Sequence, residues 1–183
     1  MSNSGRNSVS SKLPSREQAI QLLRENKCSD QVVKHCVAVA EFALEMGHEL
    51  KDKGCDLDLQ LVEIGALLHD IGRAKTHSVH HAMAGSEMAK ESGLPSSVIS
   101  IIGRHVGGGI TRKEAEELGW PKDQDYVPVT LEEKVVSYAD KLIQGSKRVP
   151  IGVVVEELKM ELKPEAAERV TRLHEEIALL LGK

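Results

Sequence analysis

One eleven-residue stretch constrains this chain more than any other. Residues 63–73, with the sequence EIGALLHDIGR, are typical of a helix that is apolar on nearly all sides and ends on His69 and Asp70. Such a helix belongs in a core, where adjacent ionisable groups are costly unless something compensates them. A divalent metal ion is one compensation, since neutral imidazole and carboxylate both coordinate it. The alternative is a helix C-cap, and we expect Gly72 to end the helix in the left-handed conformation.

The composition favours an all-α fold. The 183 residues are 40% hydrophobic but only 2% aromatic, so the core must be aliphatic and rich in alanine, which favours helices over sheets. The net charge of -4 provides no basic field for nucleic acid, which disfavours that partner. We find no apolar run of about 18 residues and no signal peptide, so no membrane association is expected. Three cysteines without C-x-x-C spacing suit a reducing cytoplasm, where we expect the protein to reside.

Helix signals recur along most of the chain. The exception is residues 151–160, which are compatible with either a short helix or an extended segment. Three capping boxes mark helix starts, at Ser15 with Gln18, Thr111 with Glu114, and Thr130 with Glu133. Helices are therefore predicted over 15–26, 30–51, 59–70, 78–92, 96–105, 111–118, 130–144 and from 164 onward.

The predicted elements divide the chain into three parts. Residues 1–13 are rich in Ser and Asn and are expected to form a disordered tail. A helical domain follows over residues 14–148, and a helical extension over residues 149–183. The last helix carries an apolar seam that packs on its own domain or against a second chain, so a homodimer through this helix is one expectation. The seam residues are Ala166, Val170, Leu173, Ile177 and Leu180.

Several polar residues fall on helix faces that should be buried. His35 and Asp140 both lie on the apolar faces of their predicted helices. A buried histidine alone is compatible with an ordinary core residue, but a buried carboxylate needs a cation or an arginine as a partner. These helices can pack around one point, which predicts a metal site. Its candidate ligands are His35, His69, Asp70 and Asp140, with His81 and His105 on two further helices.

The order of these residues resembles the HD-domain superfamily in its HDIG form. The matching features are His35, the HDIG sequence at residues 69–72, and Asp140 within YADKL, so the resemblance covers roughly residues 15–148. It implies an all-helical bundle with metal at its centre and hydrolysis of nucleotides or other phosphoesters. HAMAG at residues 81–85 is similar to the His-x-x-x-Gly of two-metal members. His105 and its glycines resemble a loop of small diiron members that cleave dinucleoside polyphosphates.

The resemblance also implies a role for each ligand. Asp70 would bridge two ions, with His81 and His105 on the second. Some members have a histidine pair where this chain has only His105, and His77 or His80 could replace His81. Mixed nitrogen and oxygen ligands suit Fe, Mn, Zn, Co or Ni, as one ion or two. The first ion would be held by His35, His69, Asp70 and Asp140.

The expected function is that of a metal-dependent phosphohydrolase. Its substrate would be a small phosphorylated compound, a nucleotide-like phosphomonoester, phosphodiester or phosphoanhydride, cleaved by a metal-activated hydroxide. Two alternatives are a diiron HD oxygenase and a noncatalytic module that senses a nucleotide. Cationic side chains are needed near the phosphate, and arginine is favoured because it forms two bonds to one phosphate. The candidates are Arg73, Lys75, Arg104, Arg112 and Lys141.

Overall fold

Side-chain caps set where the helices begin. All three predicted capping boxes are present, at Ser15, Thr111 and Thr130. Ser29 caps the second helix through the amide of Val32, and Asp58 caps the third through the amides of Gln60 and Leu61. Each cap satisfies amides that have no partner within the helix.

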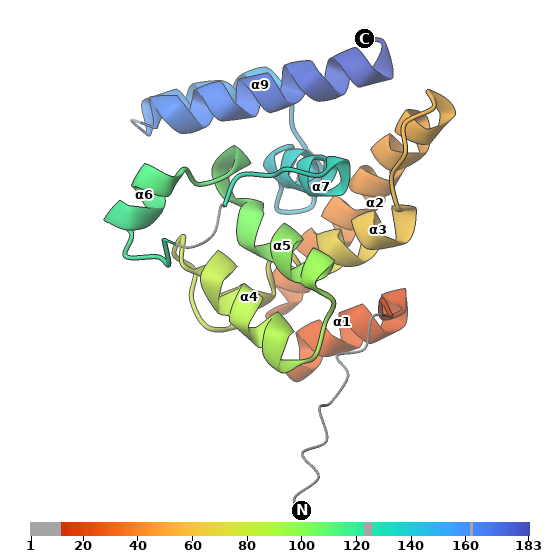
Figure 1. Ribbon diagram of the computed structural model, residues 1–183, viewed down its shortest axis with the longest axis vertical. Helices are drawn as coiled ribbons and strands as arrows, with labels where there is room; N and C mark the ends of the chain where they lie inside the picture. The colour runs from red at the N-terminus through yellow and green to blue at the C-terminus, as the bar shows by residue number, and fades with distance from the viewer. Residues whose placement is uncertain (1–11, 123–125, 162) are drawn as a thin grey trace, which may run out of the picture.

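The structure, a computed structural model, describes residues 12–122, 126–161 and 163–183, so the expected tail lies almost wholly outside the described residues (Figure 1). The all-α prediction is confirmed, since the only sheet in these ranges has two two-residue strands. The elements are α1 (Arg16–Glu25), α2 (Asp30–Asp52), α3 (Leu59–Leu68), η1 (Ile71–Ala74), α4 (His81–Glu91), α5 (Ser96–Arg104), η2 (Val106–Gly108), α6 (Arg112–Glu117), α7 (Leu131–Lys141), β1 (Ile143–Gln144), β2 (Lys147–Arg148), α8 (Ile151–Met160) and α9 (Pro164–Leu181).

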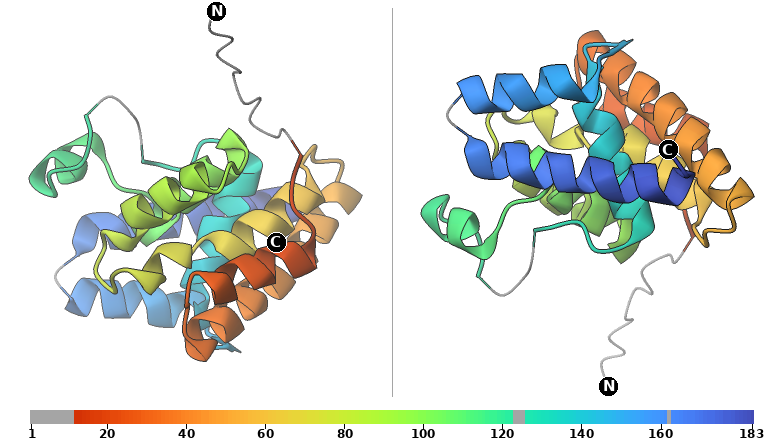
Figure 2. Two further views of the ribbon diagram at one scale, coloured as in Figure 1. Left: turned by 90° about the horizontal axis from the view of Figure 1, so that it is seen from below. Right: turned by 90° about the horizontal axis from the view of Figure 1, so that it is seen from above.

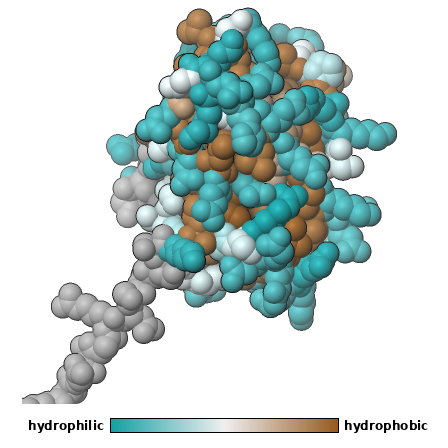
Figure 3. Space-filling view, turned by 90° about the vertical axis from the view of Figure 1, so that its right-hand side faces the viewer, coloured by the Kyte–Doolittle hydropathy of each residue, from teal (hydrophilic) through white to brown (hydrophobic). Residues whose placement is uncertain are grey.

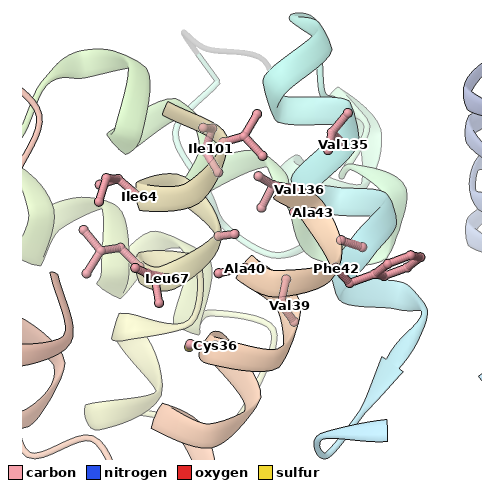
Figure 4. Close-up of a cluster of buried hydrophobic side chains, with 14 of the residues drawn as sticks. Cys36, Val39, Ala40, Phe42, Ala43, Ile64, Leu67, Ile101, Val135 and Val136 are labelled. Atoms are coloured by element: carbon pink, nitrogen blue, oxygen red, sulfur yellow. The ribbon is translucent and has the colours of Figure 1, made fainter. Parts of the chain in front are cut away.

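The helix α3 is the centre of the core. It contacts α1, α2, α5 and α7, and its residues from Ile64 to Leu68 are fully or almost fully buried. Figure 4 shows Ile64 and Leu67 of α3 together with residues of α2, α5 and α7. A Cβ on Gly65 would lie 2.4 Å from Ile101, so this glycine lets α5 approach α3 closely. The aliphatic core expected from the composition therefore surrounds the helix that leads to His69.

Three predicted helix boundaries are wrong. The helix expected over 130–144 ends at Lys141, and Ile143 pairs with Arg148 in an antiparallel turn around Gly145, whose φ is +63°. The helix expected to include Asp70 ends at Leu68, and α4 begins at His81 rather than near residue 78. Residues 151–160 form a helix. At the last two boundaries the chain turns so that Asp70 and His81 reach the cluster, and at the first the carbonyl of Gly145 reaches Nδ1 of His35.

The C-terminal helices cover one side of the bundle. In the right view of Figure 2, α8 and α9 lie side by side over α7. The seam of α9 is buried against its own chain. At its two ends the buried residues are Ala167 and Leu181, each one position after the predicted Ala166 and Leu180. Leu179 points outward and is 79% exposed. The homodimer stays a prediction.

One face of the molecule shows a mixed surface. The face shown in Figure 3 carries many hydrophilic side chains with apolar residues between them. Among the helices of the described ranges, none combines the length and the hydropathy that a membrane span requires.

Candidate metal centre

Asp70 lies at a sharp change of direction between α3 and the short 3-10 helix η1. His69 is the C-cap of α3, and Gly72 lies within η1 without a positive φ, so the prediction of a left-handed stop is wrong. The glycine is required for another reason: a Cβ on Gly72 would lie 1.9 Å from the carbonyl oxygen of His81 and 2.5 Å from the amide nitrogen of Gly85. Gly72 and Gly85 together let η1 touch the start of α4, which brings His81 to Asp70.

The six predicted metal ligands converge at the bundle centre. His69, Asp70, His81 and His105 are buried, and His35 and Asp140 are partly exposed. The ligand atoms form three overlapping groups of three, within each of which all atoms lie within 4.8 Å of one another. The groups are His35, His69 and Asp70; His69, His105 and Asp140; and Asp70, His81 and His105.

The two carboxylate oxygens of Asp70 face different histidines. Oδ2 lies 3.9 Å from Nε2 of His35 and 3.8 Å from Nε2 of His69. Oδ1 lies 3.0 Å from Nε2 of His81 and 3.6 Å from Nε2 of His105. A carboxylate placed in this way can ligate two ions at once. Asp140 joins the first set, with its Oδ1 3.1 Å from His35 and 3.3 Å from His69.

Each of the four imidazoles points Nε2 into the cluster and Nδ1 at a backbone carbonyl. Nδ1 lies 2.7 Å from the oxygens of Ala66, Ser78 and Ile102 for His69, His81 and His105, and 2.9 Å from that of Gly145 for His35. A carbonyl oxygen only accepts, so Nδ1 carries the proton and Nε2 presents a lone pair. Metal-binding histidines are commonly oriented in this way.

The cluster therefore has an excess of acceptors. Nε2 of His81 lies 2.9 Å from Nε2 of His105, which sets two lone pairs against each other unless a cation or proton intervenes. Nε2 of His69 and Oδ1 of Asp70 are buried with no hydrogen-bond partner among the described residues. A buried polar atom without a partner costs about 1–3 kcal/mol. Divalent ions would satisfy all of these atoms, so the donor set fits them.

The electrostatics of the cluster favour charged carboxylates. Burial disfavours the carboxylate of Asp70, but the imidazoles around it outweigh burial and hold its pKa well below the usual range. The pKa of Asp140 is lowered as well, because Lys141 and the nearby histidines outweigh burial. Burial lowers the pKa of His105 to about 4, whereas the negative charges of Asp70 and Asp140 outweigh burial at His69 and raise its pKa. Neutral His105 beside two carboxylates is a protonation state that suits a metal ligand.

The predicted phosphate-binding cations separate into two groups. Arg73 donates from Nε to Asp70 Oδ2 at 2.7 Å, and Nζ of Lys141 lies 3.0 Å from Asp140 Oδ2, so both stand beside the cluster. Arg104 instead forms an ion pair with buried Glu133, at 2.8 Å. Lys75 and Arg112 are exposed and do not line the cavity described next. The structure therefore brings Arg73 and Lys141 to the site and not the other three.

A cavity of about 860 Å³ opens beside the cluster. Of the six ligand candidates, His35 and Asp140 line it, together with Arg73 and Lys141. The remaining wall is mixed: α6 contributes only charged side chains, whereas apolar side chains come mainly from α8 and from the segments that flank α6, among them Val154, Ile110 and Leu118. A substrate entering this cavity would meet the cluster from the side of His35 and Asp140.

The alternative ligands His77 and His80 lie outside the cluster. Both are exposed. Nδ1 of His80 accepts a hydrogen bond of 2.9 Å from Nε1 of Trp120, and the carbonyl of His77 accepts one from Arg73. Trp120 thus orients His80. It also belongs to a small second hydrophobic core beneath α6.

Sequence reasoning missed three cations that line the cavity, Lys113 on α6, Lys163 at the start of α9 and Arg169 on α9. No motif marked them as ligand-binding residues, although Lys113 lies within the capping box of α6. Only the packing of α6 and α9 against the bundle brings them to the same cavity as His35.

The bundle and its buried cluster define a helical protein built around a site for divalent metal. The chain belongs to the HD-domain family, because the family model for the HD domain matches residues 32–144. That match includes all six ligand candidates and excludes α8 and α9.

Relatives of known sequence extend the match beyond the domain. The uncharacterized protein MJ0778 of Methanocaldococcus jannaschii is 45% identical over 167 residues, which cover 90% of this chain and 98% of that protein. The tRNA (cytidine(56)-2'-O)-methyltransferase of Picrophilus torridus is 35% identical over 171 residues, 93% of this chain. The present chain spans only 48% of that methyltransferase.

A solved structure supports the fold. The HD domain of the L. monocytogenes phosphodiesterase PgpH, in complex with cyclic-di-AMP, superposes with a TM-score of 0.53 at 17% identity. The match covers 90% of this chain and 96% of that domain. It therefore extends beyond residues 32–144, which the family model matches.

Proposed function

We propose that this protein is a metal-dependent phosphohydrolase acting on a nucleotide-like phosphoester or phosphoanhydride. The observation that carries the proposal is the position of Asp70, whose two oxygens face two separate pairs of imidazoles. A purely structural core would not need so many buried acceptors, because a protein with apolar residues at these positions would be equally or more stable.

The ligand sets follow from the same distances. One ion would be held by His35, His69, Asp70 and Asp140, and a second by Asp70, His81 and His105. Bound ions of this kind supply an activated hydroxide and stabilise charge on phosphoryl oxygens. The mixed nitrogen and oxygen donors are compatible with Fe, Mn, Zn, Co or Ni.

Arg73 and Lys141 have two tasks in this proposal. Each holds a carboxylate of the cluster in place, since Arg73 contacts Asp70 and Lys141 contacts Asp140. Each also lines the cavity, where a cation attracts an incoming phosphate. The Arg73 guanidinium is further held by its bond to the carbonyl of His77, at 3.0 Å, so its orientation is fixed before substrate arrives.

The comparisons support the reaction class and the kind of substrate. The HD domain of PgpH belongs to a phosphodiesterase and forms a complex with a cyclic dinucleotide. The present cavity, at about 860 Å³, is large enough for a ligand of nucleotide size, since small-molecule sites are roughly 300–1,000 Å³.

The test is product release from a substrate panel, measured as inorganic phosphate, as p-nitrophenol or as the shorter nucleotides formed. The panel contains p-nitrophenyl phosphate, bis-p-nitrophenyl phosphate, nucleoside mono-, di- and triphosphates, and dinucleoside polyphosphates, each with Mn, Fe(II), Co or Zn. Release should require metal and should vanish in Asp70→Ala. Asp56→Ala is the matched control, because Asp56 is an exposed loop carboxylate away from the cluster. Protein that holds metal but releases no product with any panel member would contradict the proposal and favour the oxygenase or the nucleotide sensor.

A further inference from the structure

Arg169 occupies an unusual position for a surface arginine. It lies on α9, outside the residues matched by the HD-domain model, and it lines the cavity beside the metal centre. Its side chain is only 15% exposed. A guanidinium stays charged at any ordinary pH, so a charge this deep must be compensated.

The compensation visible in the structure is incomplete. Nη2 of Arg169 donates to Oε1 of Glu114 at 2.9 Å, while Nε is buried and has no acceptor among the described residues. The charge of Glu114 is also shared, because its Oε2 accepts from both the amide and the hydroxyl of Thr111, at 2.8 and 2.6 Å. A buried N–H of a charged group without an acceptor is unfavourable, so Glu114 compensates the charge of Arg169 only in part.

Arg169 is also close to the chain that carries His105. The element η2 follows His105 directly, and a Cβ on Gly108 of η2 would lie 3.4 Å from the Cβ of Arg169. Lys113 of α6 lines the same cavity. The cavity therefore has two cations at the metal centre, Arg73 and Lys141, two on the wall formed by α6 and α9, Lys113 and Arg169, and Lys163 at the start of α9.

Acidic side chains also line the cavity, Glu157 on α8 and Glu117 and Glu165 on the same two helices as Lys113 and Arg169. Like charges in apposition are unfavourable, so an anionic ligand needs cations to offset these carboxylates. Besides Lys163, the cations available are Arg73 and Lys141 at the cluster, and Arg169 with Lys113 on the wall formed by α6 and α9. The volume of about 860 Å³ lies near the upper end of the range for small-molecule sites, which leaves room for a ligand that spans both pairs.

We propose that Arg169, assisted by Lys113, binds a second phosphoryl group of the substrate while the first lies at the metal centre. The inference rests on the proposed function and narrows it to compounds with two phosphoryl groups. It also gives the C-terminal helix a part in substrate selection, although α9 lies outside the family match.

The test compares binding of three adenine nucleotides to the manganese-loaded full chain by isothermal titration calorimetry. AMP carries one phosphoryl group, whereas α,β-methylene-ADP and adenosine 3',5'-bisphosphate carry two at different separations. Wild type should bind at least one of the two latter compounds about tenfold more tightly than AMP, as expected for a hydrogen bond to a charged group. In Arg169→Met, which keeps an apolar stem for packing, that ratio should fall below about twofold.

Arg172→Ala is the matched control, since Arg172 lies on the same helix in an exposed ion pair with Glu168. It should keep the wild-type ratio. If Arg169→Met does not fold, Arg169→Lys replaces it and should lose part of the ratio, because lysine lacks the planar fork. A wild type that binds all three compounds equally, or a ratio that survives loss of Arg169, would overturn the inference. Phosphate release is assayed in parallel, so an inactive protein that still shows the ratio would refute the proposed function alone.

Discussion

Gly72→Ala is the perturbation that most directly tests how the site is assembled. The added Cβ would lie 1.9 Å from the carbonyl oxygen of His81, whereas an ordinary contact is at least 3.4 Å. The overlap of about 1.5 Å falls on backbone atoms of η1 and α4, which cannot rotate away as a side chain would. Overpacking of a close contact costs about 1–3 kcal/mol, and we expect this case at the upper end.

The measurement is thermal and urea unfolding of metal-free protein. In a chain of this length 1 kcal/mol shifts Tm by about 2–4 °C, so a loss of about 3 kcal/mol should lower Tm by about 6–12 °C. Gly152→Ala is the control, because Gly152 is a helical glycine of α8 with nothing within 4 Å of its added Cβ. That change should be neutral or stabilising by up to about 1 kcal/mol. A Gly72→Ala protein as stable as wild type would refute the claim that η1 and α4 require a glycine contact.

Two further predictions concern the metal centre itself. Metal content measured by elemental analysis should fall from two ions to none in Asp70→Ala, because Asp70 faces both sets of histidines. It should fall only to one ion in His81→Ala or Asp140→Ala, since each of these residues belongs to one set. One ion retained in Asp70→Ala would exclude the bridging role. In metal-free protein the free energy of unfolding should fall as the pH drops from about 6.5 to about 4, since His105 has a folded pKa of about 4 and takes up a proton only on unfolding. Urea unfolding at each pH should show a smaller change in His105→Gln, and equal slopes in the two proteins would contradict this assignment.

The sign of the pH effect follows from the two protonation states. Between the folded and unfolded pKa values the unfolded chain binds more protons at His105, so stability rises with pH across that window. The lowered pKa values of Asp70 and Asp140 act in the same direction at still lower pH, near the pKa of an unfolded carboxyl. The raised pKa of His69 acts oppositely and removes stability above its unfolded value.

Four of the six candidate metal ligands could be anticipated because each has a local signature. His35 and Asp140 interrupt apolar helix faces, and His69 and Asp70 follow a helix with almost no polar side. Desolvation makes such positions costly, so the sequence alone indicates that something charged must meet them. The phosphate-binding residues have no such signature. Arg104 looks as suitable as Arg73 in the sequence, yet it is bound to Glu133.

Local chemistry determined the helical class and the capping boxes and marked candidate ligands, because these depend on periodicity, on side chains within one turn of a helix end, and on burial of polar groups. The packing of distant segments decided the rest. Gly72 is a glycine because α4 passes over it, and α7 ends early because Ile143 pairs with Arg148. Arg169 reaches the cavity only because α9 folds back onto η2. Contacts between residues this far apart in sequence leave no periodic pattern, so only the tertiary structure placed them at the site.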